Sequence, residues 1–464
     1  MKRIAIIGGG ISGLAAAFAL EEYRRSAEAA LEYVLYESST RLGGVLRTEM
    51  VGGCVVEAGP DSFLTEKPWA TELCRALGIE DQLIGSSDTE RKTYILSNGR
   101  LVPIPDGLMF LVPTKILPTA FSPLFSWNTK LRMAREFSLQ PHILDHDEPV
   151  AAFVERHYGA EMVDRLADPL LSGIYGGNAA DLSVRAVLPR FAEMERTHGS
   201  LGRALLAARG NQSHAASPPI FTSLRNGMQS LADAVVARLT PGSLRLNTRV
   251  LNAHCENEGW SVTDSAGQTE TFDAVIVAVP AHTAASILRA VNPELSVELA
   301  GIQYGSTITV ALGYDRQVRM ALPPGFGFLV PRSEDQRLLA ATFVHNKFPH
   351  RAPADRALLR CFVAGISAEH IWPLSDDQIL GIVRNELQQI LGLSAEPLFF
   401  RVYKWKSAMA QYGVGHLDRL DRMERLRRQL PGLALAGNGY RGIGIPDCIR
   451  SGRDAANEAL TTCR

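Results

Sequence analysis

The stretch RIAIIGGGISG, residues 3–13, contains the pattern that decides the fold. Residues 3–7 form a short apolar run, glycines follow it, and ISGLAAAFALEEY (11–23) has the spacing of a helix. EYVLYES (32–38) is another run rich in β-branched and aromatic residues, typical of a strand. The order of strand, glycine turn, helix and strand predicts a dinucleotide-binding unit.

The glycines Gly8, Gly10 and Gly13 are typical of a turn that binds a pyrophosphate. Glycine permits the tight turn, the close approach of the backbone to the phosphates and the packing of helix on strand. The helix N-terminus adds N–H donors and a partial positive charge. Glu37 ends the second strand, where a carboxylate holds ribose hydroxyls and repels the extra phosphate of NADP. The alternative is a purely structural glycine turn, but the flanking elements and Glu37 favour a dinucleotide.

Three further stretches favour FAD over NAD. The turn Arg41-Leu42-Gly43-Gly44 and the stretch Gly59-Pro60-Asp61-Ser62 follow Glu37, and a short NAD-binding unit needs neither. Taken alone, both could be ordinary turns. Near the C-terminus, four glycines (437, 439, 442 and 444) precede a helix entered through Pro446. The N-terminus of that helix would stabilise the negative charge that a reduced flavin gathers.

Composition limits the class of protein. The 464 residues have a net charge of -1 and 21% charged residues, which excludes a disordered chain and a basic nucleic-acid-binding domain. The six cysteines are scattered without metal-ligand spacing, so we expect neither a metal site nor a disulfide framework. The N-terminus lacks the apolar region of a signal peptide. We therefore expect cytosolic synthesis, a cytoplasmic location and no nucleic-acid partner.

The middle of the chain differs from its ends. Residues 101–127 are apolar but contain five prolines, residues 128–205 are helical and charged in pattern, and 207–219 are expected to form a mobile loop. Strands are expected at 243–250, 260–264 and 272–280. Further sheet strands are expected within 296–424, with a helix at 376–391.

Residues 100–136 combine apolar character with positive charge. They hold five basic and two acidic residues, a local charge of +3 (5 − 2). Such a segment can lie in one leaflet of a membrane and bind anionic lipid. The alternative is a proline-rich loop that covers a substrate cleft. We expect shallow membrane contact.

Seven motifs together resemble one family: GGGISGLAAA (8–17), RLGG (41–44), EAGPDSFLTEK (57–67), PLLSGIYGG (169–177), FPHRAP (348–353), QYGVGH (411–416) and GIGIPDCIRSG (442–452). They resemble the oxygen-dependent protoporphyrinogen and coproporphyrinogen oxidases of heme and chlorophyll synthesis, and the resemblance runs from residue 4 to about 456. It implies FAD, oxidation of a porphyrinogen by six electrons, and O2 as the acceptor with H2O2 as product.

The same resemblance implies an α/β (mixed α+β) fold of three interleaved domains. Residues 1–78, 220–295 and 425–464 would form a Rossmann-like FAD-binding domain, assembled from discontinuous segments. Residues 79–104 and 296–424 would form a mixed-sheet substrate-binding domain, and 105–219 a helical, membrane-associated domain. Family members often form homodimers, although no sequence feature here demands one. Neighbouring heme-pathway enzymes are further expected partners.

Matching motif by motif assigns the site residues. The ADP half of FAD would contact Gly8, Gly10, Gly13, Glu37, Arg41 and Gly44, with Val250 near the adenine. The flavin would contact Gly59, Pro60, Asp61, Ser62, Trp405, Gly444 and Ile445. For the substrate, Gly173, Ile174 and Phe348 would flank the macrocycle and Lys67 would meet a propionate.

One position departs from the family pattern. Animal and plant members resemble each other in an arginine before the Tyr of a Y-x-x-x-N-G stretch, whereas here Thr93 precedes Tyr94, and Arg91 and Lys92 lie further back. The choice between protoporphyrinogen IX, with two propionates, and coproporphyrinogen III, with four, therefore stays open.

The expected reaction needs no strong acid or base. A porphyrinogen meso carbon loses hydride to flavin readily, so a pocket has only to position the C–H bond and exclude water. We therefore assign no catalytic acid or base, and we interpret His416 as a structural histidine. The alternatives are an amine oxidase or phytoene-desaturase-like flavoenzyme and, from another class, a non-catalytic flavin-bound scaffold.

Overall fold

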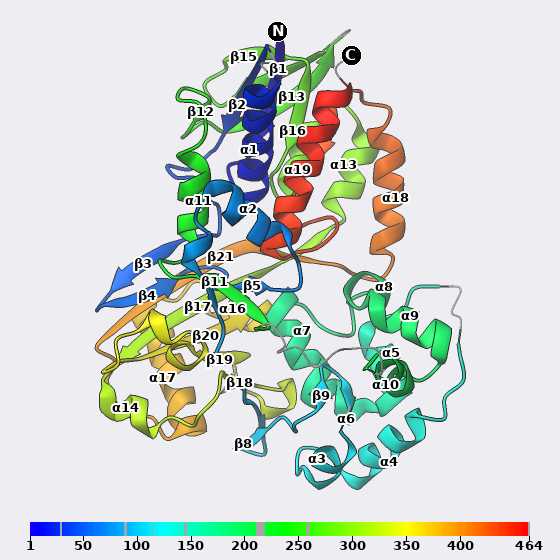
Figure 1. The fold of residues 1–464 in the computed structure, drawn as a ribbon, viewed down its shortest axis with the longest axis vertical. Helices are drawn as coiled ribbons and strands as arrows, with labels where there is room; N and C mark the ends of the chain where they lie inside the picture. Colours follow the sequence, from blue (N-terminus) through cyan, green and yellow to red (C-terminus); the bar gives the residue numbers. More distant parts are fainter. Residues whose placement is uncertain are drawn as a thin grey trace.

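The computed structural model describes residues 1–27, 30–87, 91–113, 115–142, 146–209, 219–256 and 259–462. Figure 1 shows an upper body that contains both termini, a sheet with helices below it, and a group of helices beside that sheet. In the described part of the chain, no helix combines the length and the apolar character needed to cross a membrane.

The upper body is built on a five-stranded parallel sheet. Its order is β12 (Leu244–Arg245), β2 (Leu31–Tyr36), β1 (Lys2–Ile7), β16 (Ala274–Val277) and β22 (Leu433–Leu435). The strands come from the start, the middle and the end of the chain. The sheet is therefore assembled from discontinuous segments, and the strand expected within 272–280 is confirmed.

The two faces of this sheet bury alternate residues of each strand, as a sheet covered on both sides requires. Ile4 and Ile6 pack against α1 (Ile11–Ser26), α2 (Trp69–Leu77), α11 (Gln229–Val236) and α19 (Ile445–Thr462). Ala5 and Ile7 pack against the opposite layer. That layer contains α12 (Ala281–Leu288), α13 (Pro293–Ala300), α18 (His416–Arg427) and an antiparallel sheet of β13 (Val250–Glu256), β14 (Gly259–Asp264) and β15 (Thr269–Phe272).

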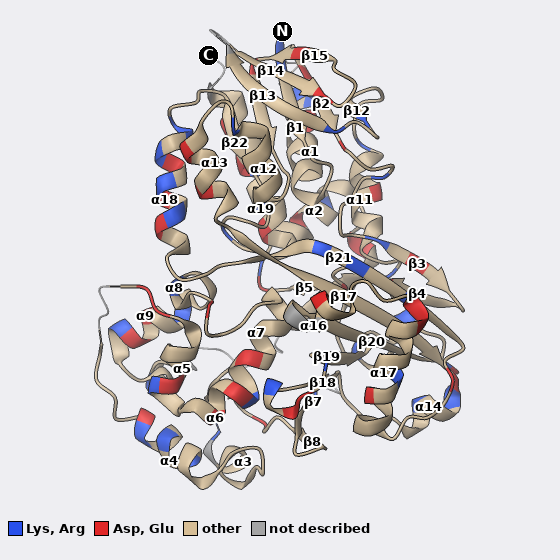
Figure 2. Cartoon of the chain, turned by 180° about the vertical axis from the view of Figure 1, so that it is seen from behind, with Lys and Arg blue, Asp and Glu red and all other residues tan. Residues whose placement is uncertain are grey.

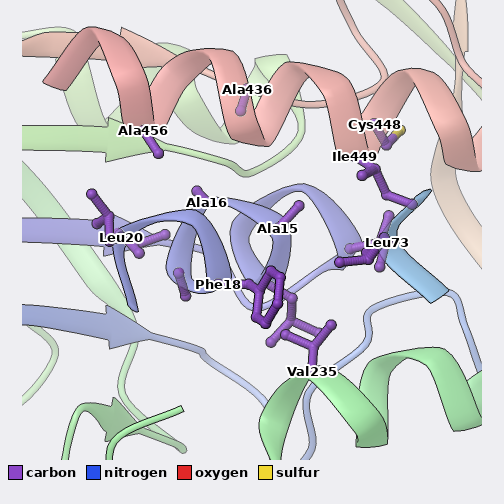
Figure 3. Close-up of a cluster of buried hydrophobic side chains, with 14 of the residues drawn as sticks. Ala15, Ala16, Phe18, Leu20, Leu73, Val235, Ala436, Cys448, Ile449 and Ala456 are labelled. Atoms are coloured by element: carbon purple, nitrogen blue, oxygen red, sulfur yellow. The ribbon is translucent and has the colours of Figure 1, made fainter. Parts of the chain in front are cut away.

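The two ends of the chain meet where α1 packs on α19. Figure 3 shows Ala15 and Ala16 of α1 facing Ile449 and Ala456 of α19. A Cβ at Gly452 of α19 would lie 2.1 Å from the Ser12 carbonyl oxygen. The helices approach this closely because small residues line their contact.

The predicted strand at 243–250 is interrupted. Leu244–Arg245 form β12, β13 begins at Val250, and the residues between them turn away from the parallel sheet. Asn247 has a φ of 54°, a left-handed conformation that no strand continues. The backbone N–H of Thr248 donates to the carbonyl oxygen of Glu37 instead. The correction is that one predicted strand is two elements of different sheets.

The lower sheet has seven strands. Its order is β21 (Phe399–Gln411), β17 (Gln303–Tyr314), β20 (Ala357–Ala364), β19 (Ala340–Phe343), β18 (Gly327–Leu329), β7 (Thr93–Ser97) and β8 (Arg100–Pro103). Only the β18–β7 pair is parallel within this sheet. The helix predicted at 376–391 is confirmed as α17, whose N-terminus has a capping box of Ser375 and Gln378. α14 (Arg316–Ala321), α15 (Val344–Lys347) and α16 (Gly365–Ile371) complete this region.

The remaining helices form a separate core around Phe153, Tyr158 and Leu166. They are α3 (Ile116–Phe121), α4 (Trp127–Glu136), α5 (Val150–Tyr158), α6 (Ala160–Met162), a π-helical segment (Val163–Ala167), α7 (Asp168–Tyr175), α8 (Val184–Val187), α9 (Pro189–His198) and α10 (Leu201–Arg209). The helical pattern of 128–205 is thus confirmed. Residues 207–209 of the predicted loop belong to α10, and 210–218 lie outside the described residues.

Short strands connect the upper and lower bodies. They are the hairpin β3 (Thr48–Val51) and β4 (Cys54–Glu57) and the sheet β5 (Phe63–Leu64), β11 (Phe221–Leu224) and β6 (Leu83–Gly85). β9 (Leu108–Met109) pairs with β10 (Val112–Pro113) ahead of α3. The chain between β4 and β5 contains the predicted flavin loop.

Candidate functional site

The turn between β1 and α1, residues 8–13, requires glycine at specific positions. A Cβ at Gly13 would lie 1.9 Å from the Gly8 carbonyl oxygen, and Gly8 has a φ of +108°. Gly10 differs, because a Cβ there would have no neighbour within 4 Å. Gly10 is the N-cap of α1 with no capping side chain, and the first turn of α1 contains no acidic residue. Open space at an uncapped helix N-terminus suits an anionic group such as a pyrophosphate.

The turn at 41–44 packs directly on this glycine turn. The backbone N–H of Gly43 donates to the Gly9 carbonyl oxygen at 2.8 Å, and a Cβ at Gly44 would lie 3.1 Å from the Gly10 Cα. Arg41 donates to the carbonyl oxygens of Leu42, Leu46 and Gly44, so it holds its own turn in shape. Burial, with Arg47 adding to it, lowers the pKa of Arg41.

Glu37 lies beside both turns. One carboxylate oxygen accepts from the Gly9 backbone N–H at 2.7 Å and the other from the Ser39 N–H at 2.8 Å. Its carbonyl oxygen accepts from the Thr248 N–H, which brings the start of β13 at Val250 to the same place. The structure therefore gathers the residues predicted for the ADP half: Gly8, Gly10, Gly13, Glu37, Arg41, Gly44 and Val250.

The loop at 58–62 is fixed from three sides. A Cβ at Gly59 would lie 1.9 Å from the Val45 carbonyl oxygen, so the loop packs tightly on the segment after Gly44. The Trp405 indole donates to the Ala58 carbonyl oxygen at 2.8 Å, and Arg360 donates to that of Gly59. Trp405 and Gly59, 346 positions apart (405 − 59), thus lie together as the resemblance implied.

Buried charges support this loop. Lys347 lies 3.2 Å from Asp61 and Arg360 lies 3.8 Å from it. Burial alone would raise the pKa of Asp61, but the charges of Lys347 and Arg360 outweigh it and hold that pKa well below its usual range. Ser62 donates to Asp61 at 2.7 Å and accepts from Lys347.

A second buried ion pair lies next to the first. Arg351 contacts Glu57 at 2.6 Å, and both side chains are almost fully buried. Glu57 also accepts from the Met228 backbone N–H, and Arg351 also donates to the Ser223 hydroxyl. Such pairs fix one geometry, because separating them leaves an uncompensated buried charge.

The glycine turn at 437–444 is held by side chains of the 411–416 segment. The Tyr412 hydroxyl donates to the Asn438 carbonyl oxygen at 2.7 Å and accepts from the Gly442 N–H at 2.8 Å. The His416 ring stacks on Tyr412, with centroids 4.1 Å apart, and bonds to the Tyr440 carbonyl oxygen. His416 therefore has the structural contacts that we expected of it. Gly444 is the last residue of this turn, and Ile445 begins α19.

The predicted substrate residues lie in different surroundings. Ile174 on α7 is 46% exposed, and a Cβ at Gly173 would meet no neighbour within 4 Å. Their neighbour Tyr175 packs against Tyr412, which places α7 beside the C-terminal glycine turn. Phe348, by contrast, is 1% exposed and lines a small cavity behind Asp61.

Lys67 also differs from its predicted surroundings. Its ammonium group lies 2.6 Å from the carboxylate of Asp447, in the first turn of α19. The sequence motifs did not indicate Asp447 as a partner, because only tertiary structure brings positions 380 residues apart together. They did not indicate Tyr412 either, whose only signal was its place in the motif QYGVGH.

The chain matches the family described as "Flavin containing amine oxidoreductase" over residues 11–460. It is 36% identical to the coproporphyrinogen III oxidase of Bacillus subtilis, covering 99% of this chain and 98% of that protein. It is 30% identical to a mitochondrial protoporphyrinogen oxidase of Nicotiana tabacum, covering 99% and 95%.

Solved structures agree with these matches. A crystal structure from Exiguobacterium sp. 255-15, assigned as a protoporphyrinogen oxidase, is 31% identical with a TM-score of 0.87 and covers 98% of both chains. A putrescine oxidase is 18% identical with a TM-score of 0.71 over 99% of both, which shows a shared fold.

Proposed function

The chain belongs to the flavin-containing amine oxidoreductase family, and from this premise we propose that it oxidises coproporphyrinogen III to coproporphyrin III with O2 as acceptor. The observation that carries the choice of substrate is the 36% identity to the Bacillus subtilis coproporphyrinogen III oxidase over nearly the whole of both chains. Coproporphyrinogen III oxidases of Propionibacterium freudenreichii and Mycobacterium tuberculosis, at 32% and 34%, support the same choice.

FAD is the cofactor, and the residues present fit it. The open space at Gly10 and the uncapped N-terminus of α1 would hold the pyrophosphate, Glu37 the ribose, and the 58–62 loop with Trp405 the flavin. When bound there, FAD would supply the redox chemistry, as the acceptor of a hydride from the substrate and the donor of two electrons to O2. Six electrons leave the macrocycle in three such oxidations, so three O2 become three H2O2.

The chain itself has to position the substrate. Gly173 and Ile174 leave an open, apolar face on α7, and Tyr175 packs on Tyr412 beside the C-terminal glycine turn. A meso C–H held at this face would need no charged base, because the flanking pyrroles stabilise the cation that hydride loss leaves. Burial, with the charge of Asp447 adding to it, raises the pKa of Tyr175 to about 12. Tyr175 is therefore neutral at physiological pH and acts as a contact surface.

The test compares both porphyrinogens with the same holoprotein. We expect kcat/KM for coproporphyrinogen III to exceed that for protoporphyrinogen IX at least about tenfold, a difference of about 1.4 kcal/mol in transition-state binding. Porphyrin fluorescence and peroxide formation are both measured. Equal or reversed preference would contradict the choice of substrate, and no turnover of either would contradict the function.

We also propose that α3 and α4 touch a membrane surface. Among the side chains that the structure describes on these two helices, four large apolar ones are highly exposed: Leu117 (69%), Phe121 (82%), Trp127 (78%) and Leu131 (70%). Lys130 lies over the Trp127 ring, so a cation accompanies the apolar face. In Figure 2, α3 carries no charged residue, whereas α18 is densely charged. An apolar helix face bordered by cations is typical of proteins that bind anionic lipid.

Flotation with vesicles of phosphatidylglycerol and phosphatidylcholine tests this surface. Changing Phe121, Trp127 and Leu131 to Ser should abolish flotation. The matched control changes Val297 and Met320, which are exposed to 70% and 75% elsewhere, and should float as the parent does. Unchanged flotation of the first variant would contradict membrane contact. If the parent does not float but sediments as a dimer, and the variant does not form that dimer, the occupant of this surface would instead be a second copy of the chain.

A further inference from the structure

The ion pair between Lys67 and Asp447 joins two distant parts of the chain. Lys67 lies just before α2, and Asp447 lies in the first turn of α19. Their charged groups are 2.6 Å apart, and the Asp447 side chain is only 4% exposed. Arg450 is a second cation at 3.7 Å from Asp447, but it also stacks on Trp69 and donates to the Arg441 carbonyl oxygen. Lys67 is thus the closer partner of this buried carboxylate.

Asp447 lies against the backbone of the C-terminal glycine turn. A Cβ at Gly442 would be 2.3 Å from the Asp447 Cγ, and one at Gly444 would be 3.2 Å from its carboxylate oxygen. The charge of Asp447 also contributes to the raised pKa of Tyr175 on α7. The carboxylate therefore borders the turn assigned to the flavin, and its charge acts on Tyr175, the neighbour of the substrate residues predicted on α7.

The charge of Asp447 opposes the electrostatic role of α19. The N-terminus of this 18-residue helix favours negative charge, such as that of a reduced flavin. A bare carboxylate in the same turn would repel that charge and favour the oxidised flavin. A cation at 2.6 Å cancels most of the repulsion.

We propose that Lys67 is a positioning residue that neutralises Asp447, so that the N-terminus of α19 can stabilise the reduced flavin. This inference rests on the proposed function, because it takes Gly444 and Ile445 as flavin contacts. It also changes the role of Lys67: its first partner is a carboxylate of the protein, with or without a substrate propionate nearby.

The test is the midpoint potential of bound FAD, measured anaerobically without substrate. Lys67→Met should shift the ratio of reduced to oxidised flavin at least tenfold toward oxidised, which is about 30 mV for a two-electron couple. Asp447→Asn should shift the ratio in the opposite direction. The double variant should lie close to the parent, because it removes the carboxylate together with the cation that neutralises it. Lys67→Arg should keep the parental potential.

Glu72→Gln is the matched control. Glu72 of α2 pairs with Arg453 of α19 at 3.2 Å, at the exposed surface. Its potential should equal that of the parent. If Lys67→Met does not retain flavin, the Asp447→Asn shift decides the test alone, and its absence overturns the proposal.

The outcomes separate this inference from the proposed function. Unchanged potentials in Lys67→Met and Asp447→Asn, with a raised KM for coproporphyrinogen III in Lys67→Met, would assign Lys67 to a propionate and overturn the inference. A parent holoprotein whose flavin no porphyrinogen reduces would contradict the proposed function, whatever the variants do.

Discussion

The two glycine-rich turns differ in how they treat charge. The turn at 8–13 leads into α1, whose first turn contains no acidic residue and whose N-cap Gly10 faces open space. The turn at 437–444 leads into α19, whose first turn contains the buried Asp447, paired with Lys67. The N-terminus of α1 has no acidic side chain, whereas the N-terminus of α19 has a carboxylate that Lys67 neutralises.

The difference matches two kinds of ligand group. A pyrophosphate is always anionic, so a bare helix N-terminus binds it at every stage of the reaction. A flavin changes its charge when it is reduced, so an adjacent ion pair can set the preference between its two states. The turns are also held by different partners, the Gly43 backbone and the Glu37 carboxylate at the first and the Tyr412 and His416 side chains at the second.

We take the loop between the two turns to be rigid. A substitution of Arg351 tests this rigidity, and we expect it to have the largest effect on stability. Arg351→Met leaves Glu57 buried without its partner, so the free energy of unfolding should fall by about 3–5 kcal/mol. Arg453→Gln removes an exposed pair and should cost about 1 kcal/mol or less. Urea denaturation measures both. Similar values for the two variants would contradict a supporting role of the buried pair.

Gly13→Ala and Gly10→Ala test the bare N-terminus of α1. At Gly13 a methyl group would lie 1.9 Å from a backbone oxygen, so we expect a loss of about 1–3 kcal/mol in stability and no bound FAD. At Gly10 the methyl group meets open space, so the apoprotein should keep its stability while FAD binding weakens. Thermal unfolding and flavin absorbance separate these effects. Parental FAD affinity of Gly10→Ala would show that the cofactor does not use this space.

Tyr412→Phe tests how the C-terminal turn is held. It removes two hydrogen bonds, to Asn438 and from Gly442, each contributing about 1 kcal/mol. We expect the free energy of unfolding to fall by about 2 kcal/mol or less, and amide exchange to accelerate at the 437–444 turn. Exchange at the 8–13 turn should stay unchanged. Equal acceleration at both turns would mean that Tyr412 acts on the whole domain.

The smallest effect concerns pH. Burial lowers the pKa of His416, and the nearby Arg419 and Arg441 add to this, while the bond to Tyr440 and the charge of Asp147 oppose it. As the pH falls, the unfolded state therefore takes up a proton at a higher pH than the folded state does. The stability that neutral His416 contributes is present above a pH of about 6.5 and is lost as the pH falls toward the folded pKa.

His416→Gln removes this titration while keeping a donor for the Tyr440 carbonyl oxygen. The stability lost between neutral and mildly acidic pH should therefore shrink, and one proton sets an upper limit of about 1.4 kcal/mol per pH unit on this change. Urea denaturation at several pH values measures it. An unchanged pH profile would contradict a neutral, buried His416.

The sequence pattern predicted the elements whose conformation depends on residues that are close together in the sequence. The strand, glycine turn and helix at 2–26 follow from residues that are neighbours in sequence, as does the helix at 376–391 with its Ser375 cap. The strand predicted at 243–250 was wrong in part, because Asn247 adopts a left-handed backbone and redirects the chain toward Glu37.

Long-range partners could not be predicted in the same way. The pairs Lys67–Asp447 and Arg351–Glu57 join positions 380 and 294 residues apart. The residues next to each position in the sequence do not indicate which residue is its partner. Phe348 stood in a motif that the resemblance assigned to substrate, but the sequence does not reveal that its ring is buried behind Asp61. The substrate residues therefore stay predictions.

The most direct measurement is anaerobic single-turnover reduction of the bound flavin by coproporphyrinogen III, with protoporphyrinogen IX as the comparison. We expect the flavin absorbance to bleach rapidly with coproporphyrinogen III and at least about tenfold more slowly with protoporphyrinogen IX at equal concentration. The absorbance should return when O2 is admitted. Flavin that stays oxidised with both porphyrinogens would contradict this expectation.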